Sequence, residues 1–332
     1  MTPVEWNGRE GGENVLEFQI PAKPVPVPVP GIAEGPSMTR PDIACVTDHV
    51  TSIGEGPLWV AREQALYWVD VGQDPKTLHR YTLADRRTTT WKLPQRASGL
   101  RERADGSLLI HFQRGLAVTD PTPERLRMLP LWGIDFSIQR FNDSAVDPAG
   151  RLWIGSYERT LKRPLGELYR IDGSLIATTI DRGFEISNGI AFSPDGRTLY
   201  HTDTHPDGRI YAWDFDPASG EAANKRVLID FAGRRGHPDG CTIDAEGMLW
   251  VAELGASQLV RIDPAGQIER EVPLPVSRPT SVAFGGPDLR TLYITSMTFM
   301  LDEGARAREP YAGRLLAFEP GVQGLALPRL AF

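Results

Sequence analysis

Apolar and polar residues alternate along most of this chain, in short runs that are separated by turns. From about residue 43 onward the runs are bounded by Gly, Pro, Asp and Asn, and helical periodicity is almost absent. Alternation with a period of two is typical of β-strands that bury one face. The pattern therefore predicts an all-β fold over residues 43–332.

The strands recur as a repeated unit. Each copy has an alternating run, a turn built on Asp, Pro or Gly, and a second run opening with Leu, as in SAVDPAGRLWIGSY (from Ser144) and CTIDAEGMLWVAE (from Cys241). The leucines follow one another at spacings of 42, 44, 47, 50 and 43 residues: Leu66, Leu108, Leu152, Leu199, Leu249 and Leu292. A period in the forties with three or four strands per copy indicates a β-propeller, here with six blades.

The two ends of the folded part should meet. A propeller usually closes by pairing a terminal strand with the opposite end of the chain, and IACVTD (Ile43 to Asp48) is the natural candidate for that strand. The segment PAKPVPVPVPG (Pro21 to Gly31) cannot form a helix and should run as extended polyproline II. We therefore expect residues 1–42 to form an N-terminal extension and residues 43–332 to form the propeller.

One position of the repeat carries polar side chains in four blades. Glu55, Asn142, Asn188 and Asp239 lie 10 or 11 residues before the leucine of their blade, where the first strand is expected to begin. First strands line the channel of a propeller, so these side chains should converge at one mouth of it. Turn formation explains each residue alone, but it explains neither a glutamate there nor the shared register. Convergent oxygen ligands fit one divalent cation, Ca²⁺, Mg²⁺ or Mn²⁺ by preference, with Zn²⁺ or Fe²⁺ as alternatives.

Composition narrows the class of protein. The 332 residues are 41% hydrophobic with a net charge of −7, so no basic face favours a nucleic-acid partner. No apolar run is long enough for a transmembrane helix, and the first residues do not resemble a secretory signal. Two cysteines, Cys45 and Cys241, favour a reducing cytoplasm over a disulfide framework. We expect a cytoplasmic protein with a small-molecule partner and no membrane partner.

The chain resembles the gluconolactonase/regucalcin family, also called senescence marker proteins. The resemblance runs from about Ile43 to the last residue and rests on stretches such as IGEGPLW, RFNDSAVDPAGRLWIG, SNGIAFSPDGRTLYHTDT and HPDGCTIDAEGMLWVAE. It implies a six-bladed propeller with one divalent metal at the channel mouth, calcium being the first candidate. By matching motifs, it assigns the metal ligands to Glu55, Asn188 and Asp239. It assigns sugar binding to Arg140 and Asn142, so Asn142 becomes a substrate contact rather than a ligand.

Most characterised members of that family hydrolyse sugar lactones. The resemblance thus implies a carboxylic-ester hydrolase in which the metal polarises the lactone carbonyl and Asp239 assists attack by water. Hydrolysis of another ester or of an organophosphate is an alternative, and so is a metal-binding propeller without turnover. Ser144 stands where many members have glycine, which bears on the substrate more than on the reaction. The long polar loop over residues 298–314 is either a lid over the mouth of the channel or a surface loop without a functional role.

Overall fold

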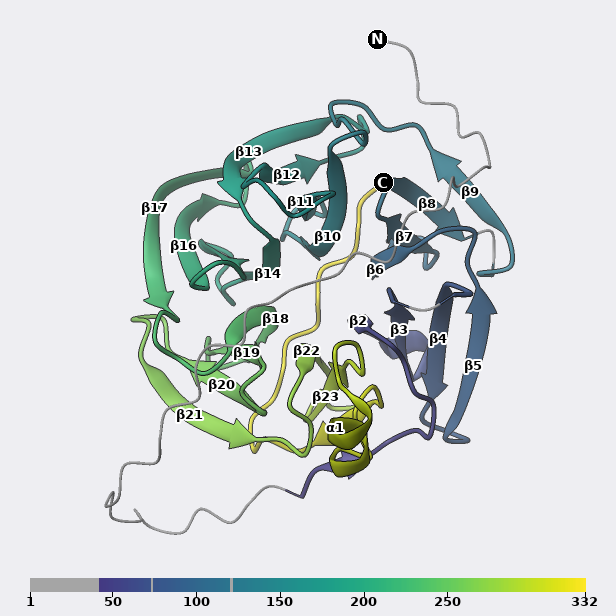
Figure 1. Ribbon diagram of the computed structural model, residues 1–332. Coiled ribbons are helices and arrows are strands. Elements are labelled where there is room, and N and C mark those ends of the chain that lie inside the picture. Colours follow the sequence, from purple (N-terminus) through teal and green to yellow (C-terminus); the bar gives the residue numbers. More distant parts are fainter. Residues whose placement is uncertain (1–41, 73, 120–121) are drawn as a thin grey trace.

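The computed structural model describes residues 42–72, 74–119 and 122–332. In these residues, six four-stranded antiparallel sheets surround a common axis (Figure 1). The prediction of a six-bladed all-β propeller is confirmed. Apart from residue 42, the expected N-terminal extension lies outside the described residues, so it stays a prediction. No helix in the described part of the chain is long and apolar enough to span a membrane.

The first three blades follow one another along the chain. Blade 1 contains β2 (Gly54–Val60), β3 (Ala65–Asp70), β4 (Thr77–Thr82) and β5 (Arg87–Lys92), with a short 3₁₀ turn at Ala61–Glu63. Blade 2 contains β6 (Ala97–Glu102), β7 (Leu108–Phe112), β8 (Gly115–Thr119) and β9 (Leu126–Leu129). Blade 3 contains β10 (Gln139–Val146), β11 (Leu152–Glu158), β12 (Gly166–Ile171) and β13 (Ala177–Phe184).

The other three blades complete the ring. Blade 4 contains β14 (Ser187–Phe192), β15 (Thr198–Asp203), β16 (Arg209–Asp216) and β17 (Glu221–Asp230). Blade 5 contains β18 (His237–Ile243), β19 (Leu249–Leu254), β20 (Gln258–Ile262) and β21 (Ile268–Pro273). Blade 6 contains β22 (Pro279–Gly285), β23 (Thr291–Ser296), β24 (Leu316–Phe318) and β1 (Ala44–Cys45). The helix α1 (Glu303–Arg308) lies between β23 and β24.

The ring closes where the sequence predicts. In β1, Ala44 pairs with Ala317 and Cys45 with Leu316, so the strand within Ile43–Asp48 completes the blade formed by the last strands. Both cysteines are free thiols.

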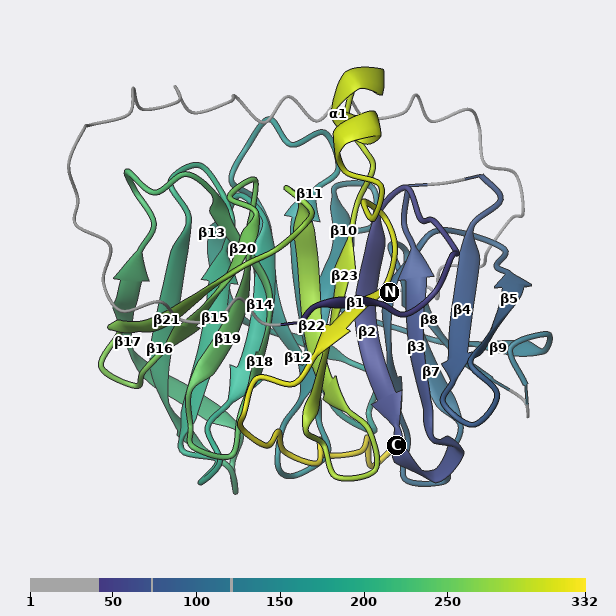
Figure 2. The same cartoon turned by 90° about the horizontal axis from the view of Figure 1, so that it is seen from below.

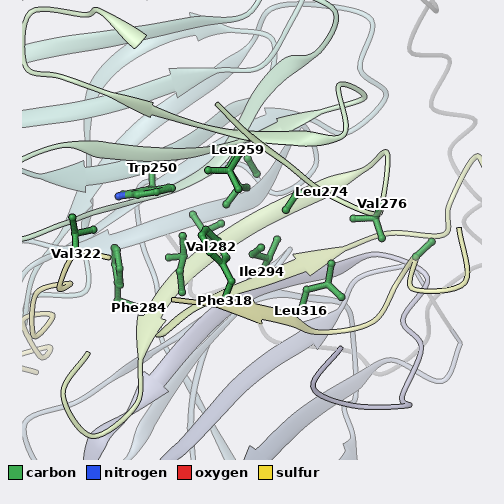
Figure 3. Packing of buried hydrophobic residues seen from close by; sticks show 14 residues of the cluster. Trp250, Leu259, Leu274, Val276, Val282, Phe284, Ile294, Leu316, Phe318 and Val322 are labelled. Carbon is green, nitrogen blue, oxygen red and sulfur yellow. The ribbon is translucent and has the colours of Figure 1, made fainter. Parts of the chain in front are cut away.

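Apolar side chains between neighbouring blades form the core. Figure 3 shows this packing between blades 5 and 6, where Trp250 and Leu259 face Phe284, Ile294 and Phe318. The leucines that mark the repeat are all buried, at 4% exposure or less. Burying one such side chain stabilises the fold by about 1.5–3 kcal/mol. The repeat seen in the sequence is thus a repeat of inter-blade packing.

The aspartates in the turns of two copies also have a packing role. Asp244 accepts backbone hydrogen bonds from Glu246 and Met248 at 3.0 Å, and its other oxygen accepts the indole N–H of Trp250 at 2.8 Å. Asp147 makes the same contact with Trp153 at 3.0 Å. Each aspartate therefore ties its turn to the tryptophan of the next strand.

The last residues cross one face of the ring. Figure 2 shows α1 on one face, here called the upper face, and the C-terminal segment on the opposite, lower face. This segment, residues 319–332, is called the strap. Its backbone bonds blade 6 (Gly324 N to Leu289 O, 2.8 Å), blade 5 (Ala245 N to Gln323 O, 2.8 Å) and blade 2 (Leu330 N to Glu102 O, 2.9 Å). It ends beside blade 3 (Ala331 N to Gly150 O, 3.0 Å).

Candidate metal site and cavity

Every inner strand carries a β-bulge at the position where the sequence has its polar residue. The register shifts between Glu55 and Leu58, Phe141 and Ser144, Asn188 and Ile190, and Pro238 and Cys241. Corresponding shifts bracket Ser98 and Thr280 in the other two blades. The expectation that the first strands begin at these positions is wrong by one to three residues, because each strand begins earlier and the polar residue lies inside it. Asn142 and Asp239 lie within the unpaired part of their bulges, whereas Glu55 and Asn188 are the last paired residues before theirs. A bulge redirects the side chains around it, which explains the shared register.

Glycines next to these residues let the inner strands approach one another. Gly56 has a φ of +58°, and a Cβ there would lie 2.7 Å from Gly99 Cα in blade 2. Gly189 has a φ of +32°, and its Cβ would lie 2.6 Å from the carbonyl oxygen of Asp239. Both positions require a residue without a side chain, since φ is positive and backbone atoms fill the space.

A cavity of about 120 Å³ opens among the upper ends of the blades. Glu55, Asn142, Asn188 and Asp239 all line it, so the structure brings together the four residues that share a register. The rest of its wall is largely apolar and includes Ile53, Val71, Ile186, Leu254, Met297 and Phe299. A few polar groups in an apolar cavity are typical of a small-molecule site.

Asn188 and Asp239 are in direct contact. The amide nitrogen of Asn188 donates to Asp239 Oδ1 and to Thr204 Oγ1 at 3.2 Å, and both residues are buried, at 7% and 4% exposure. Asn188 Oδ1 accepts the N–H of Gly189 at 3.2 Å. The Glu55 carboxylate accepts the N–H of Gly56 at 3.3 Å. Among the described residues, no lysine or arginine pairs with Glu55, which is partly buried, or with Asp239, which is buried, so neither acidic group has a counter-charge.

Burial and mutual repulsion act on these carboxyl groups. Burial, and then the charges of Asp239 and Asp143, raise the pKa of Glu55 well above its ordinary value. Burial, and then the charge of Asp143, raise the pKa of Asp239 in the same direction. Two ionised carboxylates are unstable in such a place unless a cation joins them.

The donor set suits a hard divalent cation. Two carboxylates and one amide offer only oxygen ligands, which Ca²⁺, Mg²⁺ and Mn²⁺ prefer, and the carboxylates here have unfilled acceptor positions. A half-turn of the Asn188 amide presents Oδ1 where the NH₂ group now contacts Asp239. Over the described ranges, no three His, Cys, Asp or Glu side chains cluster as a metal site.

The two expected sugar contacts differ in their setting. Asn142 lines the cavity, and its amide nitrogen donates to the carbonyl of Ser187 at 3.0 Å. Arg140 is buried at 5% exposure and donates to the carbonyls of Phe136 and Gln139, at 2.6 and 2.9 Å. Arg140 is not among the residues of the cavity wall. Its guanidinium is held against the backbone of its own blade.

Two charged residues next to the cavity could not be identified as functional from the sequence. Asp143 follows Asn142 in β10 and forms an ion pair with Arg101 of β6, with 3.4 Å between Nη2 and Oδ1. In the sequence, Asp143 directly follows the candidate Asn142, and Arg101 lies inside a strand with no distinctive motif. The charge of Asp143 raises the pKa of both Glu55 and Asp239.

Ser144 has a histidine partner in space. His111 Nε2 lies 2.9 Å from Ser144 Oγ, and His111 Nδ1 lies 3.0 Å from Ser98 Oγ. All three residues are buried, and none of them lines the upper cavity. The three side chains form a hydrogen-bonded link between blades 2 and 3.

The loop over residues 298–314 contributes to the cavity through its first residues. Phe299 and Met300 line the wall, and α1 follows, with Asp302 Oδ1 accepting the N–H of Ala305 at 2.7 Å. Glu309 at the end of the helix accepts the N–H of Ser277 at 2.7 Å. The loop is thus anchored to the connection between blades 5 and 6, and α1 projects from the upper face of the ring (Figure 2).

Comparisons with known proteins agree with this fold. The family model for the SMP-30/Gluconolactonase/LRE-like region matches residues 53–298. The 6-deoxy-6-sulfogluconolactonase of Pseudomonas putida is 36% identical over 293 residues, which cover 87% of this chain and 98% of that protein. A pentonolactonase of Haloferax volcanii is 34% identical over 257 residues, covering 76% and 84%. The crystal structure of regucalcin from Agrobacterium tumefaciens, described as a calcium-binding protein, has a TM-score of 0.80 at 29% identity, covering 87% and 97%.

Proposed function

This chain belongs to the SMP-30/Gluconolactonase/LRE-like family, and on that premise we propose that it is a metal-dependent hydrolase that opens a sugar lactone to the aldonic acid. The observation that carries the proposal is the convergence of Glu55, Asn188 and Asp239 in one cavity. Such a cavity accommodates a small ring, and its apolar wall limits the access of bulk water. The relatives named as lactonases support the same reaction type.

Glu55, Asn188 and Asp239 would hold the divalent cation, with Ca²⁺ as first candidate. When bound, the cation supplies Lewis acidity toward the lactone carbonyl and lowers the pKa of a coordinated water. Asp239 accepts a proton from the attacking water at a carboxylate oxygen and returns it to the ring oxygen as the ester bond breaks. Glu55 balances the second positive charge of the ion.

The sugar hydroxyls require polar partners along the wall. Asn142 lies in that wall and orients one hydroxyl through its amide. Arg140 contributes in our proposal by holding the backbone before Asn142, since its guanidinium binds the carbonyls of Phe136 and Gln139. The free thiols fit a reducing compartment, and we propose that the enzyme acts in the cytoplasm.

One side chain favours a lactone that carries an anionic group. Arg96 is the one lysine or arginine in the described wall of the cavity, and no hydrogen bond or ion pair joins its guanidinium to another described residue. Guanidinium groups bind sulfonate, phosphate and carboxylate through paired hydrogen bonds. A charged lactone is therefore the second candidate substrate, beside a neutral aldonolactone.

The reaction is tested with the substitution Asp239→Asn. We expect the wild type to release acid from aldonolactones only when Ca²⁺, Mg²⁺ or Mn²⁺ is present, and a chelator to abolish the activity. Asp239→Asn at saturating metal should lower kcat by about 100-fold, because the proton acceptor is lost. The control is Asp195→Asn, which changes an exposed turn carboxylate in blade 4 that is bonded to Ser193.

Two outcomes would contradict the proposal. A rate for Asp239→Asn within about threefold of wild type would remove Asp239 from the chemistry, since a proton-transfer group contributes far more. Metal binding without hydrolysis of any lactone would favour a binding protein, and hydrolysis of aryl esters or phosphotriesters alone would favour the other hydrolase class.

A further inference from the structure

A largely buried ion pair lies in the channel next to the candidate cation site. Arg101 comes from the inner strand of blade 2 and Asp143 from the inner strand of blade 3, and their side chains are only 12% and 13% exposed. Both line the lower cavity, whereas Glu55, Asn188 and Asp239 line the upper one. The pair thus sits at the level that separates the two cavities.

Backbone contacts hold the pair in place. Arg101 donates from Nη1 to the carbonyl of Leu100 at 2.7 Å and from Nη2 to the carbonyl of Ser144. Asp143 accepts the N–H of Ser144 at 2.7 Å. With these contacts, the guanidinium stays beside Asp143 and does not enter the upper cavity.

Asp143 lines the lower cavity together with Gly56 and Cys241, which lie one and two residues after Glu55 and Asp239, so its carboxyl group neighbours both of theirs. It raises the pKa of Glu55 and of Asp239, whereas Arg101 acts in the opposite direction on Asp143. Of these three carboxyl groups, only that of Asp143 forms an ion pair with a lysine or arginine among the described residues, and its partner is Arg101. Because the surroundings are buried, each charge acts strongly on the others.

We propose that Arg101 sets the net charge of the cation site and thereby its preference for a divalent ion. By pairing with Asp143, it leaves the two charges of Glu55 and Asp239 to balance the bound ion. Without Arg101 the site would carry three negative charges, a number that suits a trivalent ion. The inference rests on the proposed function, because it concerns the same cation site.

The physical reason is the dependence of Coulomb energy on both charges. One added negative charge attracts a trivalent ion half as much again as it attracts a divalent ion at the same place. Loss of Arg101 should therefore change the ratio of the two affinities, and not merely the stability of the fold. A purely structural arginine would leave that ratio unchanged.

The test measures dissociation constants for Ca²⁺ and Tb³⁺ by calorimetry and Tb³⁺ luminescence. In Arg101→Met, the preference for Tb³⁺ over Ca²⁺ should rise by about tenfold or more. In Asp143→Asn, the guanidinium is left without its partner, so Ca²⁺ should bind about tenfold more weakly and the preference for Tb³⁺ should fall. The double variant Arg101→Met/Asp143→Asn should restore the wild-type ratio, because it restores the net charge.

Controls separate this effect from others. Arg226→Met removes one arginine from an exposed pair with Asp214 in blade 4 and should leave the ratio as in the wild type. If Arg101→Met does not fold, Asp143→Asn and the double variant, which leaves no carboxylate unpaired, still test the inference. Unchanged ratios in folded variants, with Ca²⁺ still bound, would overturn the role of Arg101 alone. A wild type that binds neither ion would overturn the cation site itself.

Discussion

Arg96 is the residue from which substrate choice can be tested most directly. It lies in the cavity wall, with its guanidinium engaged by no other described residue. An arginine in that setting gains a partner when a ligand brings an anionic group.

We expect Arg96→Gln to raise KM for a lactone that carries a sulfonate, phosphate or carboxylate by about tenfold, since one charge-assisted contact is lost. KM for the matching neutral lactone should change little. Steady-state kinetics with paired charged and neutral lactones measures the difference. Arg114→Gln, at an exposed position in the same blade, is the control. Equal effects on the charged and the neutral lactone would show that Arg96 does not recognise an anion.

At the residue scale, candidate site residues can be predicted from the sequence where they recur at the same position of the repeat. Residues that form pairs between different blades cannot be predicted in this way. Glu55, Asn188 and Asp239 could be identified because one register recurs in several copies, and the structure places them in one cavity. Arg101 and Asp143 could not be identified as a pair, since they come from different copies and neither breaks the strand pattern. His111, the hydrogen-bond partner of Ser144, could not be predicted for the same reason.

At the scale of the element, the bulge in each inner strand is the feature that builds the site. An alternating sequence predicts a regular strand, and the alternation alone does not mark the extra residue. The glycine after Glu55, Asn188 or Asp239 is the sequence signal that could locate it. Such a glycine is common in turns, whereas here it permits a sharp bend inside a strand.

Gly56 allows a direct test of this interpretation. Gly56→Ala should cost more free energy of unfolding than Gly255→Ala, and it should also weaken Ca²⁺ binding, because the new Cβ meets the backbone of Gly99 at 2.7 Å and displaces Glu55. Gly255 has a φ of +88° with nothing within 4 Å, so its substitution carries only the backbone strain of about 1–2 kcal/mol. Urea denaturation and calorimetry measure the two effects. Equal losses for both variants would show that the close approach of the strands is unimportant.

For the whole molecule, the period of the repeat was sufficient to predict the number of blades and the strand that closes the ring. The strap was not predicted, because residues 319–332 do not repeat and carry no strand pattern. Its binding depends on backbone groups of loops in four blades, and these are brought together only by the finished ring.

The contribution of the strap is measured with two leucines. Leu330 is completely buried and Leu327 is 49% exposed. Leu330→Ala should lower the free energy of unfolding by about 2–5 kcal/mol, as expected for a core leucine. Leu327→Ala should cost less than about 1 kcal/mol, as for an exposed position. Similar small losses in both variants, measured by denaturation, would indicate that the strap adds little to the ring.

The strap also affects how the protein unfolds. A ring of similar blades could lose them one at a time from the seam between β1 and β24, as stacked repeats do. Here, peeling blade 6 away also requires releasing a segment that is bonded to blades 5, 2 and 3. Unfolding of blade 6 is therefore coupled to distant blades, and the chain should unfold in a single cooperative step.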